Sequence, residues 1–289
     1  MLSPVTLLLS VLAIVSLAFA VIWWRAWRAD QPPHGRPSPV LLVFGAVSLF
    51  FDTLGIGNFA PTTAFFRMTR RVRDELIPGT LNVGSALPVA IEAFAFIAAI
   101  EVDPTTLVVM VAAAFAGSVL GASVVSRMPT RPIQIGMGLA LCVGAAFMFA
   151  TNLGLFPGGG VATGFGGTSL VTATVVNFVL GGLNALGIGS YAPSLLVFSV
   201  MGMNPRAAFP IMMGSGAYML TGCGIRFVTT GRFDGAAALA LTLGGIPGVL
   251  LAAYVVKSLP LEVIRWLVVA VVSYAAVSML SAARRPISA

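Results

Sequence analysis

Residues Phe51–Thr63 read FDTLGIGNFAPTT and residues Leu183–Leu195 read LNALGIGSYAPSL, so the chain carries one motif twice, at a constant shift of 132 residues. Each copy places two glycines and a proline inside an apolar run, where an unbroken helix would be expected. Interrupted hydrophobic segments at corresponding places in two halves of a chain are typical of transporter binding sites. The identical positions are Leu54/Leu186, Gly55/Gly187, Ile56/Ile188, Gly57/Gly189, Ala60/Ala192 and Pro61/Pro193. The duplication therefore predicts a transporter with two related halves.

The composition is that of an integral membrane protein. Hydrophobic residues make up 58% of the 289 positions and charged residues 9%, whereas a soluble domain carries roughly 25% charged residues. The mean hydropathy is +1.01. We therefore expect an all-α polytopic membrane protein with about eight to nine hydrophobic segments of ~20 residues, surrounded by membrane lipid.

The net charge of +7 does not indicate a nucleic-acid partner. The arginines gather in short loops between apolar runs, which is what the positive-inside bias produces. We therefore expect these loops and the C-terminus on the cytoplasmic side of a bacterial inner membrane. The basic loops are Arg25–Arg36, Arg67–Arg73, Arg127–Arg131 and Arg284–Arg285.

Nothing in the sequence indicates a metal or cofactor site. Cys142 and Cys223 lie in apolar runs without Cys-x-x-Cys spacing, and the only histidine, His34, lies in a Pro/Gly-rich loop. Both cysteines are expected to be buried small hydrophobic residues. We expect no cofactor and no metal.

The chain divides into an N-terminal helix and two repeats. The halves stay in register beyond the motif at a shift of 131, where Asp103 matches Asp234 and Gly117 matches Gly248. Tryptophans and arginines directly after the first run favour a retained helix over a cleaved signal peptide. The expected units are an N-terminal transmembrane helix with a cytoplasmic loop (1–38), membrane repeat 1 (39–152), a flexible Gly-rich connector (153–170) and membrane repeat 2 (171–289). The apolar runs are Val5–Trp24, Val40–Phe66, Leu81–Ile100, Pro104–Val125, Pro132–Thr151, Val171–Val200, Phe209–Thr229, Gly235–Val256 and Leu261–Leu280.

Charge placement favours inverted over parallel repeats. The first broken run, Val40–Phe66, has a basic loop on either side. If both loops are cytoplasmic, the run enters and leaves on one side as a re-entrant helix pair. Three spans follow it, and an odd number of crossings inverts the second half. If the run instead crosses the membrane, for which it is long enough, the repeats are parallel.

A helix break of this kind can bind an anion without a cationic side chain. Glycines let the backbone leave helical dihedral angles, Asn58 and Ser190 can cap a new helix, and a following proline suits its first turn. Free N–H groups then face the break, with Thr63 as a further hydroxyl donor. The alternative is that the glycines only permit close helix packing. The predicted substrate-binding residues are Gly55, Gly57, Asn58, Pro61, Thr62, Asn82, Gly187, Gly189, Ser190, Tyr191, Pro193, Ser194 and Ser215.

Two acidic residues inside apolar runs are the candidates for proton coupling. A carboxylate at the centre of a membrane helix costs about 2.5–3.5 kcal/mol on insertion scales, so each is a functional hypothesis. Asp52 directly precedes the first break and could cap its free N–H groups or carry a proton. Glu92 has no acidic counterpart, because the shift of 131 reaches Cys223. An internal polar contact is the alternative role for Glu92.

The sequence resembles the sulfite exporter TauE/SafE family over Val40–Leu280. The resemblance is carried by the two broken motifs, by the stretch DPTTL…GSVLGA…MPTRPIQIGMGL, and by its echo GGIPGVLLAAYVVKSLPLEVIRWLV. It implies a permease for sulfite, for a sulfonate such as sulfoacetate, or for another sulfur-containing anion, driven by the proton gradient. Its partners would be a small anion and protons, and the chain could be a monomer or a homodimer.

Two other functions remain to be compared. A channel with two re-entrant half-helices would have the tips Asn-Phe-Ala-Pro and Ser-Tyr-Ala-Pro, as in aquaporin-type pores, but the second tip lacks the matching amide. An intramembrane enzyme is not expected, because Ser215 has no nearby base to activate it. The sequence also gives no indication that Asp52 and Glu92 lie together, as an aspartyl mechanism would require.

Overall fold

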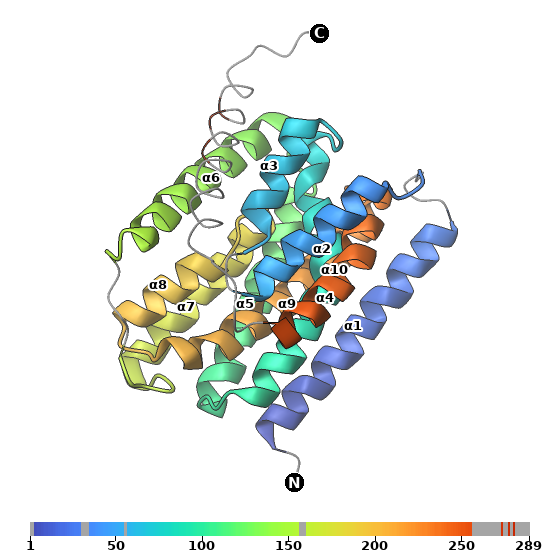
Figure 1. The fold of residues 1–289 in the computed structure, drawn as a ribbon. Helices are drawn as coiled ribbons and strands as arrows, with labels where there is room; N and C mark the ends of the chain where they lie inside the picture. The colour runs from blue at the N-terminus through green and yellow to red at the C-terminus, as the bar shows by residue number, and fades with distance from the viewer. Residues whose placement is uncertain are drawn as a thin grey trace.

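The computed structural model describes residues 3–29, 35–54, 57–155 and 160–255, together with Ser273, Val277 and Leu280. Every element named within these residues is a helix (Figure 1). Five of these helices are long and apolar enough to cross a membrane, so the expected all-α polytopic membrane fold is confirmed. The elements are α1 (Pro4–Arg28), α2 (Pro39–Thr53), α3 (Phe59–Thr69), the 3-10 helix η1 (Asp74–Leu76), α4 (Ile77–Ala99), α5 (Pro104–Val125), α6 (Thr130–Asn152), α7 (Gly167–Asn184), α8 (Tyr191–Val200), α9 (Pro205–Thr230) and α10 (Gly235–Val255).

The two apolar runs that carry the motif are each split into two helices. The run Val40–Phe66 becomes α2 and α3, and the run Val171–Val200 becomes α7 and α8. By contrast, the run Pro104–Val125 is one continuous helix with the expected bounds. Features expected from the sequence that lie outside the described residues are Gly55, His34, the connector positions 156–159 and most of the run Leu261–Leu280.

Close packing of small residues joins the helices in pairs. α2 lies along α10 (Figure 1), and α5 lies along α7. Glycines permit the approach: a Cβ on Gly248 would collide with the carbonyl oxygen of Ala46, and a Cβ on Gly117 with that of Phe178. α4 packs against both α9 and α10, and α9 packs against α5, so these helices form the interior. Such contacts are the usual source of association between helices in a membrane.

α1 lies at the outer edge of the bundle (Figure 1) and contacts it along one face. The Tyr218 hydroxyl on α9 donates to the carbonyl oxygen of Leu8 at 2.6 Å, and the Trp23 ring meets Phe233 edge-on. Residues on the other face, including Ile14 and Leu17, are exposed. An exposed apolar face is what a helix in contact with lipid requires.

The starts of α2, α4 and α10 and the end of α3 lie together at one end of the bundle, which we call the basic end. Arg71, just after α3, donates from Nη1 to Oγ of Ser38, the residue before α2, at 3.2 Å. The N–H of Asp234, just before α10, donates to Oγ1 of Thr80 in the first turn of α4 at 2.9 Å. Several helices end at the basic end with an arginine in or just after their last turn. Among the described residues these arginines are Arg25, Arg28, Arg67, Arg70, Arg71, Arg73, Arg127 and Arg232.

The starts of α5 and α7 and the end of α8 lie together at the opposite end. The described part of the connector, residues 160–166, holds them there. The N–H of Asp103, which precedes α5, donates to the carbonyl oxygen of Thr163 at 3.0 Å. The N–H of Gly160 donates to the carbonyl oxygen of Met203 at 3.1 Å. Met203 follows α8, so the connector is hydrogen-bonded to the helices on both sides.

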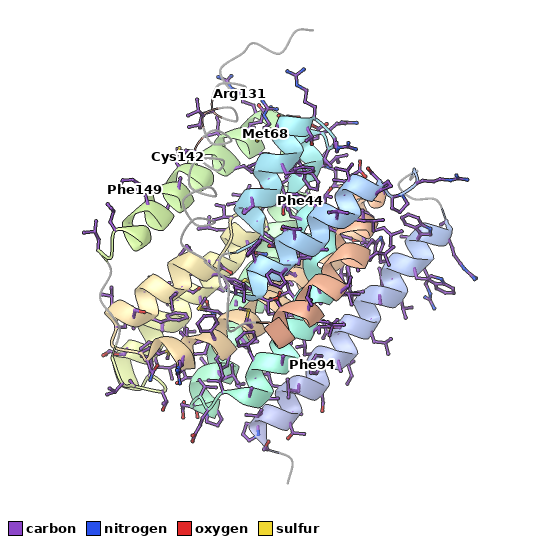
Figure 2. All side chains as sticks on the ribbon, in the orientation of Figure 1. Phe44, Met68, Phe94, Arg131, Cys142 and Phe149 are labelled. Atoms are coloured by element: carbon purple, nitrogen blue, oxygen red, sulfur yellow. The ribbon has the colours of Figure 1, made fainter. Side chains whose placement is uncertain are left out.

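The two cysteines differ in burial. Cys223 is buried on α9, as expected, but Cys142 is exposed, and the expectation that both are buried is wrong. Cys142 lies on α6 (Figure 2), which runs along the edge of the described bundle. An edge helix buries only one face, so an apolar run does not by itself predict burial of each residue.

Replacing Gly248 with alanine is expected to destabilise the α2–α10 pair. The added Cβ would collide with the Ala46 carbonyl oxygen. Because that oxygen belongs to the backbone, the clash is relieved only if the two helices move apart. Overpacking of this kind lowers the free energy of unfolding by about 1–3 kcal/mol. Thermal unfolding of the purified protein in detergent measures the effect. Gly35→Ala is the matched control, because a Cβ there has no heavy atom within 4 Å. Equal unfolding temperatures for the two variants would contradict the packing described here.

Candidate functional site

The first helix break separates α2 from α3. α2 ends at Thr53 and α3 begins at Phe59. Gly57 has a φ of 85°, a left-handed value that glycine adopts without strain. Asn58 is the N-cap residue of α3, and the first hydrogen bond of that helix runs from the Thr62 N–H to the Asn58 carbonyl oxygen at 3.0 Å. The N–H groups before Thr62 therefore have no acceptor within the helix.

The second break repeats this arrangement between α7 and α8. α7 ends at Asn184 and α8 begins at Tyr191. The left-handed glycine is Gly187, with a φ of 85°. Ser190 is the N-cap residue, and the Ser194 N–H donates to its carbonyl oxygen at 2.9 Å. The start of α8 thus also presents N–H groups that its own helix does not use.

The prolines of the motif stand at the same place in both new helices. Pro61 is the third residue of α3, and Pro193 is the third residue of α8. A proline in the first turn has no N–H to leave unsatisfied, so it starts a helix at little cost. The expectation that each proline suits the first turn is confirmed.

The caps differ from the expectation. Asn58 and Ser190 occupy the N-cap positions, but neither uses its side chain as a cap. Both residues have helical rather than extended dihedral angles, and a side chain then does not point back to the first N–H groups. The Asn58 side chain instead donates from Nδ2 to Oγ of Ser85 on α4 at 2.8 Å.

The two breaks meet each other inside the bundle. The Asn184 side chain donates from Nδ2 to Oδ1 of Asn82 on α4 at 2.9 Å. Asn82 also donates to the carbonyl oxygens of Pro78 and Asn184. In addition, a Cβ on Gly189 would lie 3.6 Å from the Cβ of Phe59, the first residue of α3. Residues far apart in the sequence therefore surround one place.

Further hydroxyl groups surround the start of α3. Thr62 Oγ1 is 2.9 Å from Ser48 Oγ on α2. Thr63 is fully buried, and its Oγ1 has no hydrogen-bond partner among the described residues. A buried hydroxyl without a partner costs about 1–3 kcal/mol. Ser194 is buried at the equivalent turn of α8.

Ser215 lies in a separate polar contact between α7 and α9. It accepts a hydrogen bond from Nδ2 of Asn177 at 2.8 Å, and the same amide donates to the carbonyl oxygen of Met110. Asn177 was not among the residues predicted from the sequence. The repeat gives no signal for it, because the shift of 132 pairs Asn177 with Gly45.

Asp52 and Glu92 lie together, although no pattern in the sequence predicted this. Both carboxyl groups are buried, and Asp52 contributes to the electrostatic surroundings of Glu92. Thr53 Oγ1 lies 2.7 Å from Oε1 of Glu92. Tyr191 interacts with both acids from the start of α8.

Neither carboxyl group is neutralised by a basic residue. Within the described ranges, no arginine or lysine is among the groups that interact with Asp52 or Glu92. Both carboxylate oxygens of Asp52 and Oε2 of Glu92 lack a hydrogen-bond partner there, although the Asn58 N–H interacts with Asp52. A buried carboxylate without a basic partner is costly, so carboxyl groups in such a place tend to be neutral.

One comparison with known proteins gives a match. A family model described as sulfite exporter TauE/SafE matches residues 1–148. The match begins at residue 1, so it includes α1, whereas the resemblance noted in the sequence began at Val40. No curated protein and no solved structure matches the chain.

The two glycines of the second motif are expected to respond differently to alanine. Gly187→Ala forces a side chain into a left-handed conformation, at a cost of about 1–3 kcal/mol, and brings its Cβ to 3.3 Å from the Leu81 and Met137 side chains. Gly189→Ala makes only an ordinary contact at 3.6 Å, with Phe59. We therefore expect a lower unfolding temperature for Gly187→Ala than for Gly189→Ala. The reverse order would contradict the geometry of the break.

Proposed function

The chain belongs to the sulfite exporter TauE/SafE family, and we propose that it carries sulfite or a small organosulfonate such as sulfoacetate across the membrane by alternating access. Membership makes it a multi-pass membrane transporter of sulfur-containing anions and not an enzyme. The observation that carries the proposal is the meeting of two helix breaks next to an unneutralised carboxyl pair. A midplane site formed by broken helices is typical of secondary transporters.

The proposed anion site lies between the starts of α3 and α8. Both starts present N–H groups without helical acceptors and the positive end of a helix dipole, which together favour an oxyanion. The buried, unpartnered hydroxyl of Thr63 supports a ligand there. Gly57 and Gly187 leave the backbone at each break without a side chain. Binding of this kind needs no cationic side chain. Without a full positive charge in the site, the anion is held weakly enough to be released.

Equivalent contacts support two structural repeats. Asp103 accepts from the Thr106 N–H at 2.7 Å, and Asp234 accepts from the Ala237 N–H at 2.9 Å. These pairs are related by the shift of 131. The packing of α2 on α10 likewise corresponds to that of α7 on α5, with Gly248 on Ala46 and Gly117 on Phe178 as equivalent contacts. Each repeat thus places its broken helix against the other repeat.

We further propose that the repeats are inverted and that each broken segment is re-entrant. α2 begins and α3 ends at the basic end, where Arg71 contacts Ser38. α7 begins and α8 ends at the opposite end, near Met203. In Figure 1 the α2–α3 pair accordingly reaches the upper part of the bundle and the α7–α8 pair the lower left. The positive-inside bias makes the basic end cytoplasmic, in a bacterial inner membrane, with the C-terminus on the same side.

Proton coupling through Asp52 and Glu92 completes the proposal. Their burial without a basic partner supports protonation during the cycle, since an isolated buried charge tends to be neutralised. The competing function is a channel for anions or small solutes with two re-entrant half-helices. The meeting of both breaks at one place is compatible with a channel, so flux measurements must separate the two.

Proteoliposome flux tests the proposed function. Uptake of sulfite and of a short sulfonate is followed with and without an imposed pH gradient, for the wild type, Asp52→Asn and Glu92→Gln. A proton-coupled transporter gives saturable, gradient-stimulated uptake, and at least one variant loses the stimulation. Glu101→Gln, at an exposed position, is the control and retains it.

Uptake that neither saturates nor responds to the gradient would support the channel instead. No uptake of either anion would contradict the substrate assignment. Equal stimulation in the wild type and both acid variants would remove Asp52 and Glu92 from the coupling mechanism.

A further inference from the structure

Four buried residues from both halves of the chain form one cluster, which we call the carboxyl cluster: Asp52 and Thr53 on α2, Glu92 on α4 and Tyr191 on α8. Thr53 is hydrogen-bonded to Glu92, and Tyr191 interacts with both acids. The first three residues precede the connector, whereas Tyr191 belongs to the second motif. The cluster therefore links the acids of one half to the helix break of the other.

Thr53 is placed to contact Glu92 in either protonation state. Its Oγ1 lies 2.9 Å from the carbonyl oxygen of Leu49 and 2.7 Å from Oε1 of Glu92. A hydroxyl group has one proton to donate. If it donates to Leu49, the shorter contact needs a proton on the Glu92 carboxyl group. If it instead donates to Glu92, the same contact fits an ionised carboxylate. The Thr53 hydroxyl can therefore serve both states of Glu92, by donating to Leu49 in one and to Glu92 in the other.

Tyr191 is positioned to respond to the same proton. It is the first residue of α8, and its hydroxyl interacts with Glu92 without forming a hydrogen bond among the described residues. Oε2 of Glu92 also lacks a partner there. The ring and hydroxyl lie against Gly216 of α9, where a Cβ would be 3.1 Å from the Tyr191 oxygen. Ionisation of Glu92 creates an acceptor that would draw the hydroxyl, and the start of α8 with it, toward α4.

The other repeat has the same arrangement with neutral residues. At the positions related by the shifts of 132 and 131, the counterparts of Asp52, Thr53 and Glu92 are Asn184, Ala185 and Cys223. The counterpart of Tyr191 is Phe59. Cys223 interacts with the Asn184 side chain, just as Glu92 interacts with Asp52. Both places are packed and buried. Packing therefore does not require ionisable groups, and their presence in one repeat alone indicates a function.

We propose that the carboxyl cluster is a single proton site, and that Tyr191 is the positioning residue through which its occupancy controls the anion site. The proposal rests on the proposed anion-transport function. Asp52 stays protonated, and Glu92 is the group that exchanges its proton. When both carboxyl groups are protonated, the cluster places no negative charge beside the starts of α3 and α8, and the anion binds. When the proton leaves, the carboxylate repels the anion and holds Tyr191. Proton and anion therefore move in the same direction.

The groups around Glu92 leave few other titrating candidates. Among the described residues, the titratable groups that interact with Glu92 are Asp52 from α2 and Tyr191 from α8. On α9, Tyr218 donates its hydroxyl to Leu8 on α1, and Cys223 lies beside Asn184. The described part of α10 and α3 contributes no charged group to this place. A change with pH should accordingly follow the cluster.

Anion uptake as a function of pH, together with the number of protons moved per anion, tests the proposal in proteoliposomes. In the wild type the KM for sulfite is expected to fall by about tenfold as the cluster becomes protonated, within the usual range of coupling between sites. In Tyr191→Phe this pH dependence is expected to shrink to about twofold or less, with a lower proton-to-anion ratio. Phenylalanine is the native residue at the equivalent position, Phe59, so the fold should tolerate it.

Two further variants make the result specific. Tyr218→Phe removes another buried tyrosine hydroxyl, on α9, and is expected to keep the wild-type pH dependence. Thr53→Ala, for which Ala185 is the native precedent, is expected to shift the pH at which the KM changes. Thermal unfolding of each purified variant checks that the fold is retained.

The outcomes separate the two proposals. Wild-type pH dependence and proton-to-anion ratio in both Tyr191→Phe and Thr53→Ala would overturn the role of the cluster and leave the transport function standing. Anion uptake driven by a sodium gradient, or protons moving opposite to the anion, would also overturn it. Absence of any anion uptake by the wild type would contradict the proposed function itself.

Discussion

A helix break inside a membrane exposes backbone N–H groups that lipid cannot satisfy. The rest of the site depends on this constraint. α3 and α8 each begin in the interior of the bundle, and each starts with N–H groups that the helix cannot use. Prolines at the third position remove one of these donors, and Asp52 interacts with the Asn58 N–H. The donors that remain are those of the proposed anion site.

The two halves share a backbone design but divide the chemistry. The breaks, the left-handed glycines Gly57 and Gly187 and the close helix pairs occur in both. The ionisable groups occur in one, with Tyr191 contributed from the other side. A symmetric scaffold with an asymmetric proton site would let one proton influence a binding site that both halves build. Rocking of two similar halves about such a site is the usual basis of alternating access.

The sequence predicted the positions of the breaks because glycine and proline act locally. Their duplication made the signal specific, and the run Pro104–Val125 was predictable from hydropathy and a proline start. The side-chain roles were less predictable, because they depend on helix directions that only packing decides. The Asn58 amide was expected to cap α3 but contacts Ser85. Thr53 has the neutral counterpart Ala185, so the repeat gave no signal for it.

Proximity across the two halves was the largest gap between sequence and structure. Asp52 and Glu92 are far apart in the chain, and Tyr191 was expected among the substrate ligands rather than beside the acids. Asn82 was predicted for the site, and the structure joins it to Asn184. In each case the partner belongs to another helix, and a single sequence does not contain the angle at which two helices cross.

The most direct test of the central claim is a crystal structure of the protein with 2-bromoethanesulfonate, with the bromine located by its anomalous scattering. The account predicts one bromine peak beside the breaks, with the sulfonate between the starts of α3 and α8 and within reach of Thr63. A peak elsewhere, for example among the arginines of the basic end, would contradict it. So would the absence of a peak at a concentration that saturates transport.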